Sequence, residues 1–214
     1  MTSPERQLAL YQAVQYIVHN NIPGDFVECG IWRGGSSMLM AHTLLKLHST
    51  ERKLYLYDTF AGMSEPTEED VNFRGDLSID KWKKMQKDHG NDWDYSSLEE
   101  VQRNMSSVEY PPDNVIFVKG KVEDTIPSQC PNKIALLRLD TDWYDSTKHE
   151  LQELYPRLQI GGILIIDDYG HWRGARKAVD EYFKENGVTM FLNRIDYTGR
   201  LGVKVDDRNH SIDS

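Results

Sequence analysis

Two pairs of acidic residues end successive apolar runs in the second half of the chain. Asp140 and Asp142 follow the run 134–139, and Asp167 and Asp168 follow the run 163–166. If both runs are strands of one parallel sheet, their carboxyl ends open into a single crevice. Like charges so close together are costly unless a proton or a cation neutralises them. An all-oxygen set favours Mg²⁺, Mn²⁺ or Ca²⁺ over Zn²⁺, so the pattern predicts a divalent-cation site. Helix caps and water-facing loop acids are the alternative.

Such a site suits group transfer onto a hydroxyl, because a neutral hydroxyl is a poor nucleophile. A cation can lower its pKa and orient it, while a neighbouring base takes the proton. We predict Asp140, Asp167 and Asp168 as metal ligands and Asp142 as the general base, with Asp140 also counted in the catalytic centre. His171 is a reserve base, although an ordinary surface role is as compatible with a single loop histidine.

A glycine-rich turn precedes these acids, in the pattern E-x-G-x-x-x-G. Its glycines allow a sharp turn and close approach to a ligand, and the helix that follows offers free N–H groups to a carboxylate. A dinucleotide site would carry Gly where this chain has Glu28. An acid there is typical of methyltransferases that use S-adenosylmethionine. In these enzymes the carboxylate accepts a hydrogen bond from the amino group of the cofactor's methionine moiety or lies near its sulfonium. We predict cofactor contacts from Glu28, Cys29, Gly30, Gly34, Ser36 and Ser37; a purely structural turn is the alternative.

Two further strand ends complete this predicted cofactor site. Asp58, followed by Thr59, closes the apolar run 54–57, where an acid grips the ribose hydroxyls of a nucleoside. The run 115–118 leads to Gly120 and Glu123, where the adenine is expected, and Asp140 is also predicted as a cofactor contact. Asp58 as a turn cap, and Glu123 or Asp124 as a helix cap, are the alternatives.

Apolar runs that alternate with amphipathic segments predict the elements that carry these residues. A parallel sheet covered by helices on both faces follows from this order, with the last two strands forming an antiparallel hairpin. The acidic, Trp-rich segment 64–112 breaks the rhythm and is predicted to be a mostly helical insertion over one α/β domain, 1–214. Strands are expected at 25–29, 54–57, 115–118, 134–139, 163–166, 189–192 and 201–205. Helices are expected at 35–47, 146–158 and 173–186, with a first helix capped by Thr2 and Glu5.

Composition narrows the class of partner. The 214 residues include 25 basic and 34 acidic side chains, for a net charge of −9, which disfavours nucleic acid or an anionic membrane as partner. The N-terminus lacks a basic region leading into an apolar run, and no apolar run reaches the roughly 18 residues of a membrane span, so we expect a cytoplasmic protein. Cys29 and Cys130 are expected to be reduced thiols.

The segments FVECGIWRGGSS, LYLYDTFAGM, LLRLDTDWYDST and GGILIIDDYGHWRGARKAVDEYF resemble the macrocin O-methyltransferase (TylF-like) family, over about residues 24 to 195. The resemblance implies a Rossmann-like class I methyltransferase fold that uses S-adenosyl-L-methionine and Mg²⁺ (or Mn²⁺). It implies a small hydroxylated acceptor, a sugar hydroxyl of a glycosylated natural product, and a homodimer. It also implies the metal, base and cofactor roles given above, and a lid over the acceptor at 64–112. Aromatic lid residues expected to stack on the acceptor, or simply to pack, are Trp82, Trp93, Tyr95 and Tyr110.

Three other protein classes share parts of these motifs. The glycine-rich turn of this chain lacks the G-x-G-x-x-G of an NAD-dependent oxidoreductase. A D-x-D phosphatase would carry its motif on the first strand and Thr or Val at the position of Tyr144. A non-catalytic S-adenosylmethionine-binding protein has no need of a base. For a methyltransferase, a catechol-like or other small hydroxylated acceptor is the alternative to a sugar.

Overall fold

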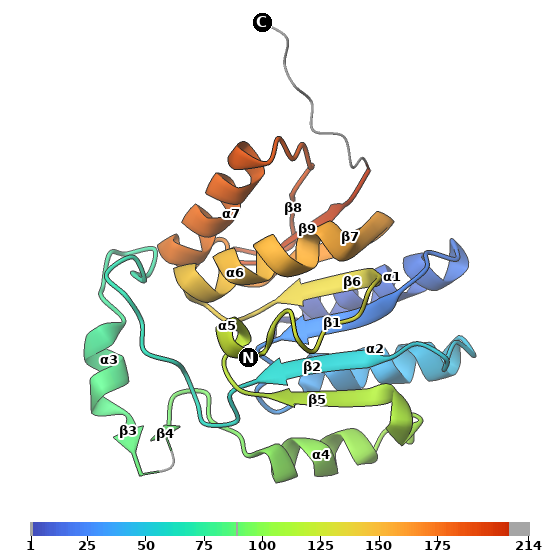
Figure 1. Cartoon of the computed structure of the whole chain (residues 1–214), viewed down its shortest axis with the longest axis horizontal. Helices are drawn as coiled ribbons and strands as arrows, with labels where there is room; N and C mark the ends of the chain where they lie inside the picture. Colours follow the sequence, from blue (N-terminus) through green and yellow to red (C-terminus); the bar gives the residue numbers. More distant parts are fainter. Residues whose placement is uncertain (1, 89, 206–214) are drawn as a thin grey trace, which may run out of the picture.

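A seven-stranded sheet forms the centre of the computed structural model, which describes residues 2–88 and 90–205 (Figure 1). The strand order is β5-β2-β1-β6-β7-β9-β8. The first five strands pair in parallel, whereas β9 pairs antiparallel with β7 and with β8. The mostly parallel sheet with an antiparallel C-terminal hairpin is therefore confirmed. The strands are β1 (Asp25–Cys29), β2 (Leu54–Asp58), β5 (Val115–Lys119), β6 (Ile134–Leu139), β7 (Leu158–Ile166), β8 (Asn193–Arg194) and β9 (Arg200–Val203).

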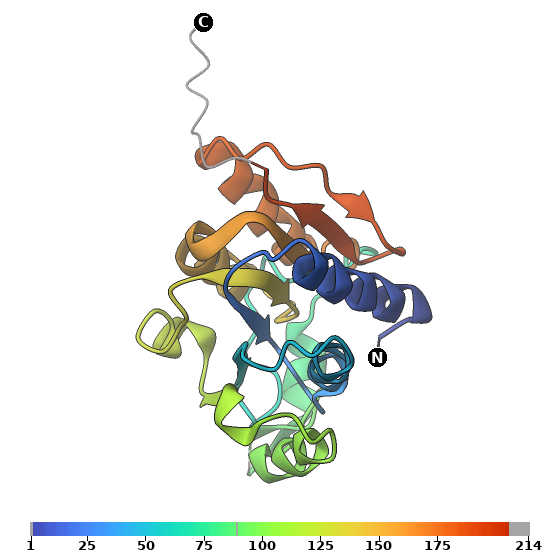
Figure 2. The same ribbon diagram turned by 90° about the vertical axis from the view of Figure 1, so that its right-hand side faces the viewer.

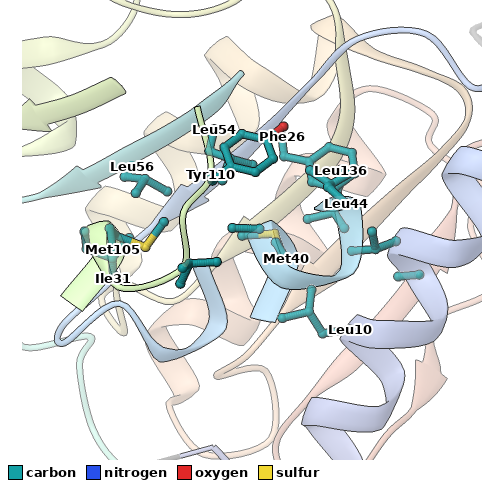
Figure 3. Close-up of a cluster of buried hydrophobic side chains, with 14 of the residues drawn as sticks. Leu10, Phe26, Ile31, Met40, Leu44, Leu54, Leu56, Met105, Tyr110 and Leu136 are labelled. Atoms are coloured by element: carbon teal, nitrogen blue, oxygen red, sulfur yellow. The ribbon is translucent and has the colours of Figure 1, made fainter. Parts of the chain in front are cut away.

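Helices cover both faces of this sheet (Figure 2). Successive side chains of a strand point to opposite faces, so Phe26 packs with the first helix layer and Val27 with the second. Figure 3 shows Leu10, Met40 and Leu44 of the first layer gathered with Phe26. The first layer holds α1 (Pro4–His19), α2 (Gly35–Lys46) and α4 (Leu98–Ser106), and the second holds α5 (Val122–Thr125), α6 (Tyr144–Leu154) and α7 (Arg173–Glu185). Two short 3₁₀ helices are η1 (Pro112–Asn114) and η2 (Tyr155–Arg157).

The predicted cap of the first helix is wrong by one residue. Ser3, not Thr2, caps α1, because Pro4 occupies the first helical turn. The Ser3 hydroxyl accepts from the Arg6 backbone N–H at 3.2 Å.

Two strand boundaries also differ from the prediction. The strand predicted at 189–192 forms instead at β8, where the chain comes alongside β9. The strand β7 begins at Leu158, ahead of the predicted start at 163, because Leu158 already pairs with Ile134 of β6.

The segment 64–112 divides into two parts. Its last helix, α4, belongs to the body, because Val101 and Met105 are buried in the main core. The part before α4 lies beyond the carboxyl ends of the strands (Figure 1) and holds α3 (Ile79–Lys84), β3 (Gln86–Lys87), β4 (Gly90–Asn91) and loops. Trp93 anchors this part by packing on Trp143 and Trp172, with ring centroids 5.5 and 6.0 Å away.

In the described parts of the chain, no helix combines the length and the apolar character that crossing a bilayer requires.

Candidate active site

A cavity of about 700 Å³ opens at the carboxyl edge of the parallel strands. The loops after β1, β2, β5, β6 and β7 line it, together with the start of α1 and part of the lid segment. Five strands from distant parts of the sequence thus bring their terminal residues into one site. The predicted residues that line it are Glu28, Gly30, Ser36, Asp58, Thr59, Gly120, Glu123, Asp140, Asp142, Asp167, Asp168 and His171.

Three residues predicted for the cofactor lie outside this lining. The Cys29 side chain is buried against the second helix layer, because it alternates with Glu28 along β1. Ser37 does not line the cavity but contacts a residue that does, because its hydroxyl donates to the Glu28 carboxylate. Gly34 caps α2 in the left-handed conformation, with φ +81°, which glycine adopts without strain.

The glycine-rich loop is held in place by Asp58. One oxygen of its carboxylate accepts from the backbone N–H groups of Ile31 and Trp32, each at 3.0 Å, and the other accepts from Phe60 at 2.8 Å. Gly30 has φ +79°, and a side chain there would collide with the carbonyl oxygen of Asp140. Burial raises the pKa of Asp58, and the backbone donors oppose that rise. A carboxylate oxygen has two acceptor sites, so Asp58 can support the loop and still accept from a ligand hydroxyl in the cavity.

A buried arginine to which the sequence analysis assigns no role, Arg138, contacts three carboxylates of the site. Arg138 on β6 donates to Glu28 and Asp140 at 2.7 Å and to Asp167 at 2.6 Å. Burial raises the pKa of Glu28, while the Arg138 charge and the Ser37 hydroxyl lower it. A lone arginine inside the apolar run IALLRL was the available signal, because a buried guanidinium needs carboxylate partners.

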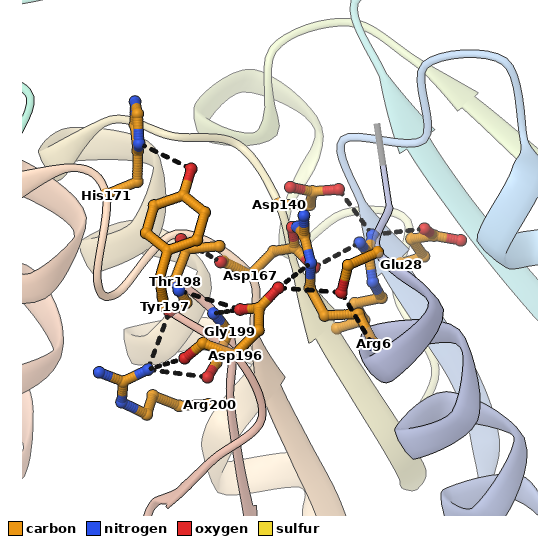
Figure 4. A network of polar contacts seen from close by, with 12 residues as sticks. Arg6, Glu28, Asp140, Asp167, His171, Asp196, Tyr197, Thr198, Gly199 and Arg200 are labelled. Atoms are coloured by element: carbon orange, nitrogen blue, oxygen red, sulfur yellow. Dashed lines mark hydrogen bonds and ion pairs between the residues drawn. The ribbon is translucent and has the colours of Figure 1, made fainter.

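A second arginine reaches the same network from the N-terminal helix. Arg6 pairs with Asp167, and its Nε lies 3.0 Å from Asp196 Oδ2. The Ser3 hydroxyl also donates to Asp196 at 3.0 Å. Asp167 is thus held between two guanidinium groups (Figure 4). No local pattern marks Arg6, because its partner lies far away in the sequence.

Three carboxylates form a compact cluster on the other side of Asp140. In the described residues, one oxygen each of Asp140, Asp142 and Asp168 lies within 4.8 Å of the others. Asp142 has φ +68°, a left-handed conformation that is uncommon outside glycine and concentrates at functional sites. Asp142 joins this cluster, whereas the Asp167 side chain is directed to the arginines.

The electrostatics of the cluster favour a bound cation. No lysine or arginine within 2–88 and 90–205 forms an ion pair with Asp142 or Asp168. Burial raises the pKa of Asp142 to about 6, and burial together with the neighbouring carboxylates raises the pKa of Asp168 well above its ordinary value. Three clustered carboxylate donors fit a hard divalent cation such as Mg²⁺ or Mn²⁺. The cavity as a whole is lined by eight carboxylates against four arginine or lysine side chains, so it also favours a positively charged ligand.

The four aromatic lid residues proposed for stacking do not line the cavity. Trp93 is buried among other tryptophans, and Tyr110 is buried in the main core with its hydroxyl donating to the Arg52 carbonyl at 2.7 Å. The Trp82 indole donates to the Met63 carbonyl at 2.8 Å. These three aromatic side chains therefore make packing contacts within the protein, which was the alternative to stacking on the acceptor.

Comparison with known proteins places this architecture among methyltransferases. The family model of macrocin-O-methyltransferase (TylF) matches residues 1–201. Demethyldecarbamoylnovobiocin O-methyltransferase of Streptomyces niveus is 35% identical over 88% of this chain and 69% of its own length. Mycinamicin III 3''-O-methyltransferase of Micromonospora griseorubida is 32% identical over 93% of this chain and 76% of its own. The structure of the O-methyltransferase NovP superposes with a TM-score of 0.80 at 32% identity, covering 94% of this chain and 80% of that one. The expected class I methyltransferase fold is thereby confirmed.

Proposed function

Because the chain belongs to the macrocin-O-methyltransferase (TylF) family and is an S-adenosylmethionine-dependent O-methyltransferase, we propose that it methylates a sugar hydroxyl of a glycosylated small molecule with the help of a divalent cation. One observation carries this proposal: the Asp140, Asp142 and Asp168 cluster lies in the same cavity as the glycine-rich cofactor loop. A methyl donor and an activated hydroxyl must meet within one site for the transfer to occur. Two relatives support a glycosylated acceptor. One, from Streptomyces olivaceus, is named as the 4'-O-methyltransferase of a rhamnosyl-tetracenomycin, and the other is named for mycinamicin III.

The donor side of the site is assigned to the strands β1, β2 and β5. S-adenosylmethionine supplies a methyl group bound to a positively charged sulfur. We assign Glu28, buried and tied to Arg138, to the methionine moiety, and Asp58 with Thr59 to the ribose hydroxyls. Gly120 and Glu123 then lie at the adenine end. The excess of carboxylates in the cavity favours the cationic donor over its neutral product, S-adenosylhomocysteine.

The acceptor side is assigned to the strands β6 and β7. A divalent cation, when bound, supplies positive charge that lowers the pKa of the acceptor hydroxyl. We propose that Asp140 and Asp168 hold this cation and that the Asp142 carboxylate takes the proton from the hydroxyl oxygen. Asp167, predicted as a third ligand, is occupied by Arg6 and Arg138. In this assignment Asp167 stabilises the two arginines and sets the local charge.

Calorimetric titration with Mn²⁺ separates these carboxylate roles. We expect Asp140→Asn and Asp168→Asn each to weaken Mn²⁺ binding at least about 10-fold, because each variant removes a charged ligand. Asp142→Asn removes a nearby charge but no ligand in this assignment, so it should weaken Mn²⁺ binding less than either of those variants and lose turnover. If Asp142→Asn weakens Mn²⁺ binding as strongly as Asp168→Asn, Asp142 is a ligand and not the base.

Methyl transfer itself is tested by incubating the protein with S-adenosylmethionine, Mg²⁺ and either demethyldecarbamoylnovobiocin or mycinamicin III, followed by mass spectrometry. Addition of one methyl group to either acceptor, abolished by EDTA, is the expected result. A simple catechol methylated in preference to both would move the acceptor class to small phenols. Absence of S-adenosylhomocysteine binding in calorimetry would contradict the assignment of the cavity.

We further propose a single functional domain, with the part of 64–112 that precedes α4 serving as the lid, in a cytoplasmic homodimer. Light scattering coupled to size exclusion reports the oligomeric state directly.

A further inference from the structure

Three aromatic rings stand together at the mouth of the active-site cavity. Phe73 comes from the lid loop, His171 from the loop after β7, and Tyr197 from the turn between β8 and β9. Their centroids are 5.5 Å (Phe73–His171), 5.9 Å (His171–Tyr197) and 6.4 Å (Phe73–Tyr197) apart, all edge to face. His171 and Tyr197 also line the cavity, so this aromatic rim continues its wall outward. Figure 4 shows the Tyr197 ring beside His171, next to the Asp167 network.

The outer rings of the aromatic rim are exposed, although large apolar side chains generally gain by burial. Phe73 keeps 47% of its surface exposed and Tyr197 keeps 55%. Exposed aromatics clustered at a cavity mouth mark a binding surface more than isolated ones do. Since none of the four predicted aromatic lid residues lines the cavity, the rim offers the open aromatic surface that those residues were expected to provide.

Hydrogen-bonded turns hold both outer rings in position. The Asn72 side chain accepts from the backbone N–H groups of Arg74 and Asp76 at 2.9 and 3.0 Å, and Arg173 donates to the Phe73 carbonyl at 3.1 Å. On the other side, Asp196 accepts from the N–H groups of Thr198 and Gly199 at 2.9 and 2.7 Å.

Tyr197 is fixed at its tip as well, because its hydroxyl lies 3.1 Å from His171 Nδ1. Rings presented on such turns lose little freedom when a ligand binds, which favours affinity. The arrangement suits recognition of a flat apolar group by stacking.

We propose that Phe73, His171 and Tyr197 bind the aglycone of the acceptor and select glycosides whose sugar carries an aryl group. The inference rests on the proposed transfer to a sugar hydroxyl. With that hydroxyl at Asp142, the remainder of the acceptor extends along the cavity toward the aromatic rim. His171 connects the two regions, since its backbone N–H donates to the Asp168 carbonyl at 2.9 Å while its ring packs in the rim.

Two model ligands that differ only at the aglycone test this assignment: p-nitrophenyl α-L-rhamnoside and methyl α-L-rhamnoside. Their affinities are measured by calorimetry on the protein saturated with S-adenosylhomocysteine and Mg²⁺. We expect the wild type to bind the aryl glycoside about 3- to 10-fold more tightly, the range of an aromatic pair. Phe73→Ala and Tyr197→Ala should each reduce this preference, and the double variant should abolish it.

Matched variants separate stacking from damage to the fold. Tyr197→Phe keeps the ring and loses only the hydroxyl contact with His171, so it should keep most of the preference. Phe191→Ala, at a side chain 85% exposed elsewhere on the surface, should change nothing. Thermal unfolding and S-adenosylhomocysteine affinity should be unchanged in all variants. The inference is overturned if the wild type shows no aryl preference, if it binds neither glycoside, or if the preference survives in the double variant. Methylation of a glycoside by the wild type without an aryl preference would leave the proposed function standing and remove this inference alone.

Discussion

Replacing Arg138 by methionine should strongly destabilise the protein at neutral pH. The guanidinium is buried and contacts Glu28, Asp140 and Asp167 at 2.6 to 2.7 Å. Methionine has a similar length and no charge, so the packing is largely kept while three carboxylates lose their common partner. Breaking a buried ion pair by removing one member typically costs about 3–5 kcal/mol, because the other member stays buried and uncompensated.

A second route gives the same magnitude. The variant can relieve the uncompensated charge by protonating Glu28, whose pKa burial already raises. A carboxyl with an unfolded pKa of about 4.3 costs roughly 4 kcal/mol to protonate at pH 7.5 and about 1.6 kcal/mol at pH 5.5. The folded variant then binds a proton that the unfolded chain releases above this pKa. Its stability therefore rises as the pH falls, and the deficit relative to wild type is largest at neutral pH.

Urea unfolding of the ligand-free protein at pH 7.5 and 5.5 measures this effect. We expect Arg138→Met to lose about 4 kcal/mol at pH 7.5, and to recover roughly 2 to 3 kcal/mol of that deficit at pH 5.5. If the protein is only marginally stable, this variant is unfolded at pH 7.5, and Arg138→Lys then reports an intermediate loss. Adding Glu28→Gln to Arg138→Met should restore part of the stability.

The control is Arg103→Met, at an exposed arginine of α4. A surface substitution of this kind should leave the free energy of unfolding within about 0.5 kcal/mol of the wild-type value at both pH values. An Arg138→Met variant within about 1 kcal/mol of wild type at pH 7.5, well below the cost of breaking a buried ion pair, would refute the reasoning. So would a deficit that does not change with pH.

Three further outcomes are expected. Asp142→Asn should lower turnover at least about 100-fold, the usual contribution of a general base, while S-adenosylhomocysteine affinity stays within about 2-fold; near-normal turnover under saturating Mg²⁺ removes Asp142 as the base. Gly30→Ala should abolish cofactor binding or folding, because the left-handed backbone and the Asp140 carbonyl exclude a side chain. A Cβ at Gly35 meets open space, so the control Gly35→Ala should unfold like the wild type. Circular dichroism and calorimetry measure both variants, and a stable, cofactor-binding Gly30→Ala would contradict the geometry. Arg6→Gln should tighten Mn²⁺ binding about 3- to 10-fold in calorimetry, since it removes a positive charge beside Asp167, and an unchanged affinity would show that Asp167 does not influence the cation site.

Much of the architecture could be predicted from local patterns. Apolar runs of strand length ended by acids marked β2, β6 and β7, and the glycine-rich turn after Glu28 marked the end of β1. The carboxyl ends of parallel strands share one edge of the sheet. The positions of Glu28, Asp58, Asp140 and Asp168 in the cavity follow from that rule. The predicted bounds of β8 were wrong, because only the pairing with β9 makes a strand of so short a segment.

The sequence alone thus determined that acidic residues meet at one edge of the sheet. The tertiary structure decided which groups each of their side chains contacts. Asp142 turns into the carboxylate cluster through a left-handed backbone that no spacing rule predicts. The Asp167 side chain is directed away from the cluster because its oxygens pair with Arg138 and with Arg6, which lies 161 positions earlier in the chain. Likewise, Trp93 is buried and Trp82 is partly buried, while Phe73 and Tyr197 stay exposed. The reason is physical: a hydrogen bond or ion pair depends on which groups the completed fold brings within about 3 Å of each other. A local sequence pattern does not encode which distant groups will meet at that distance.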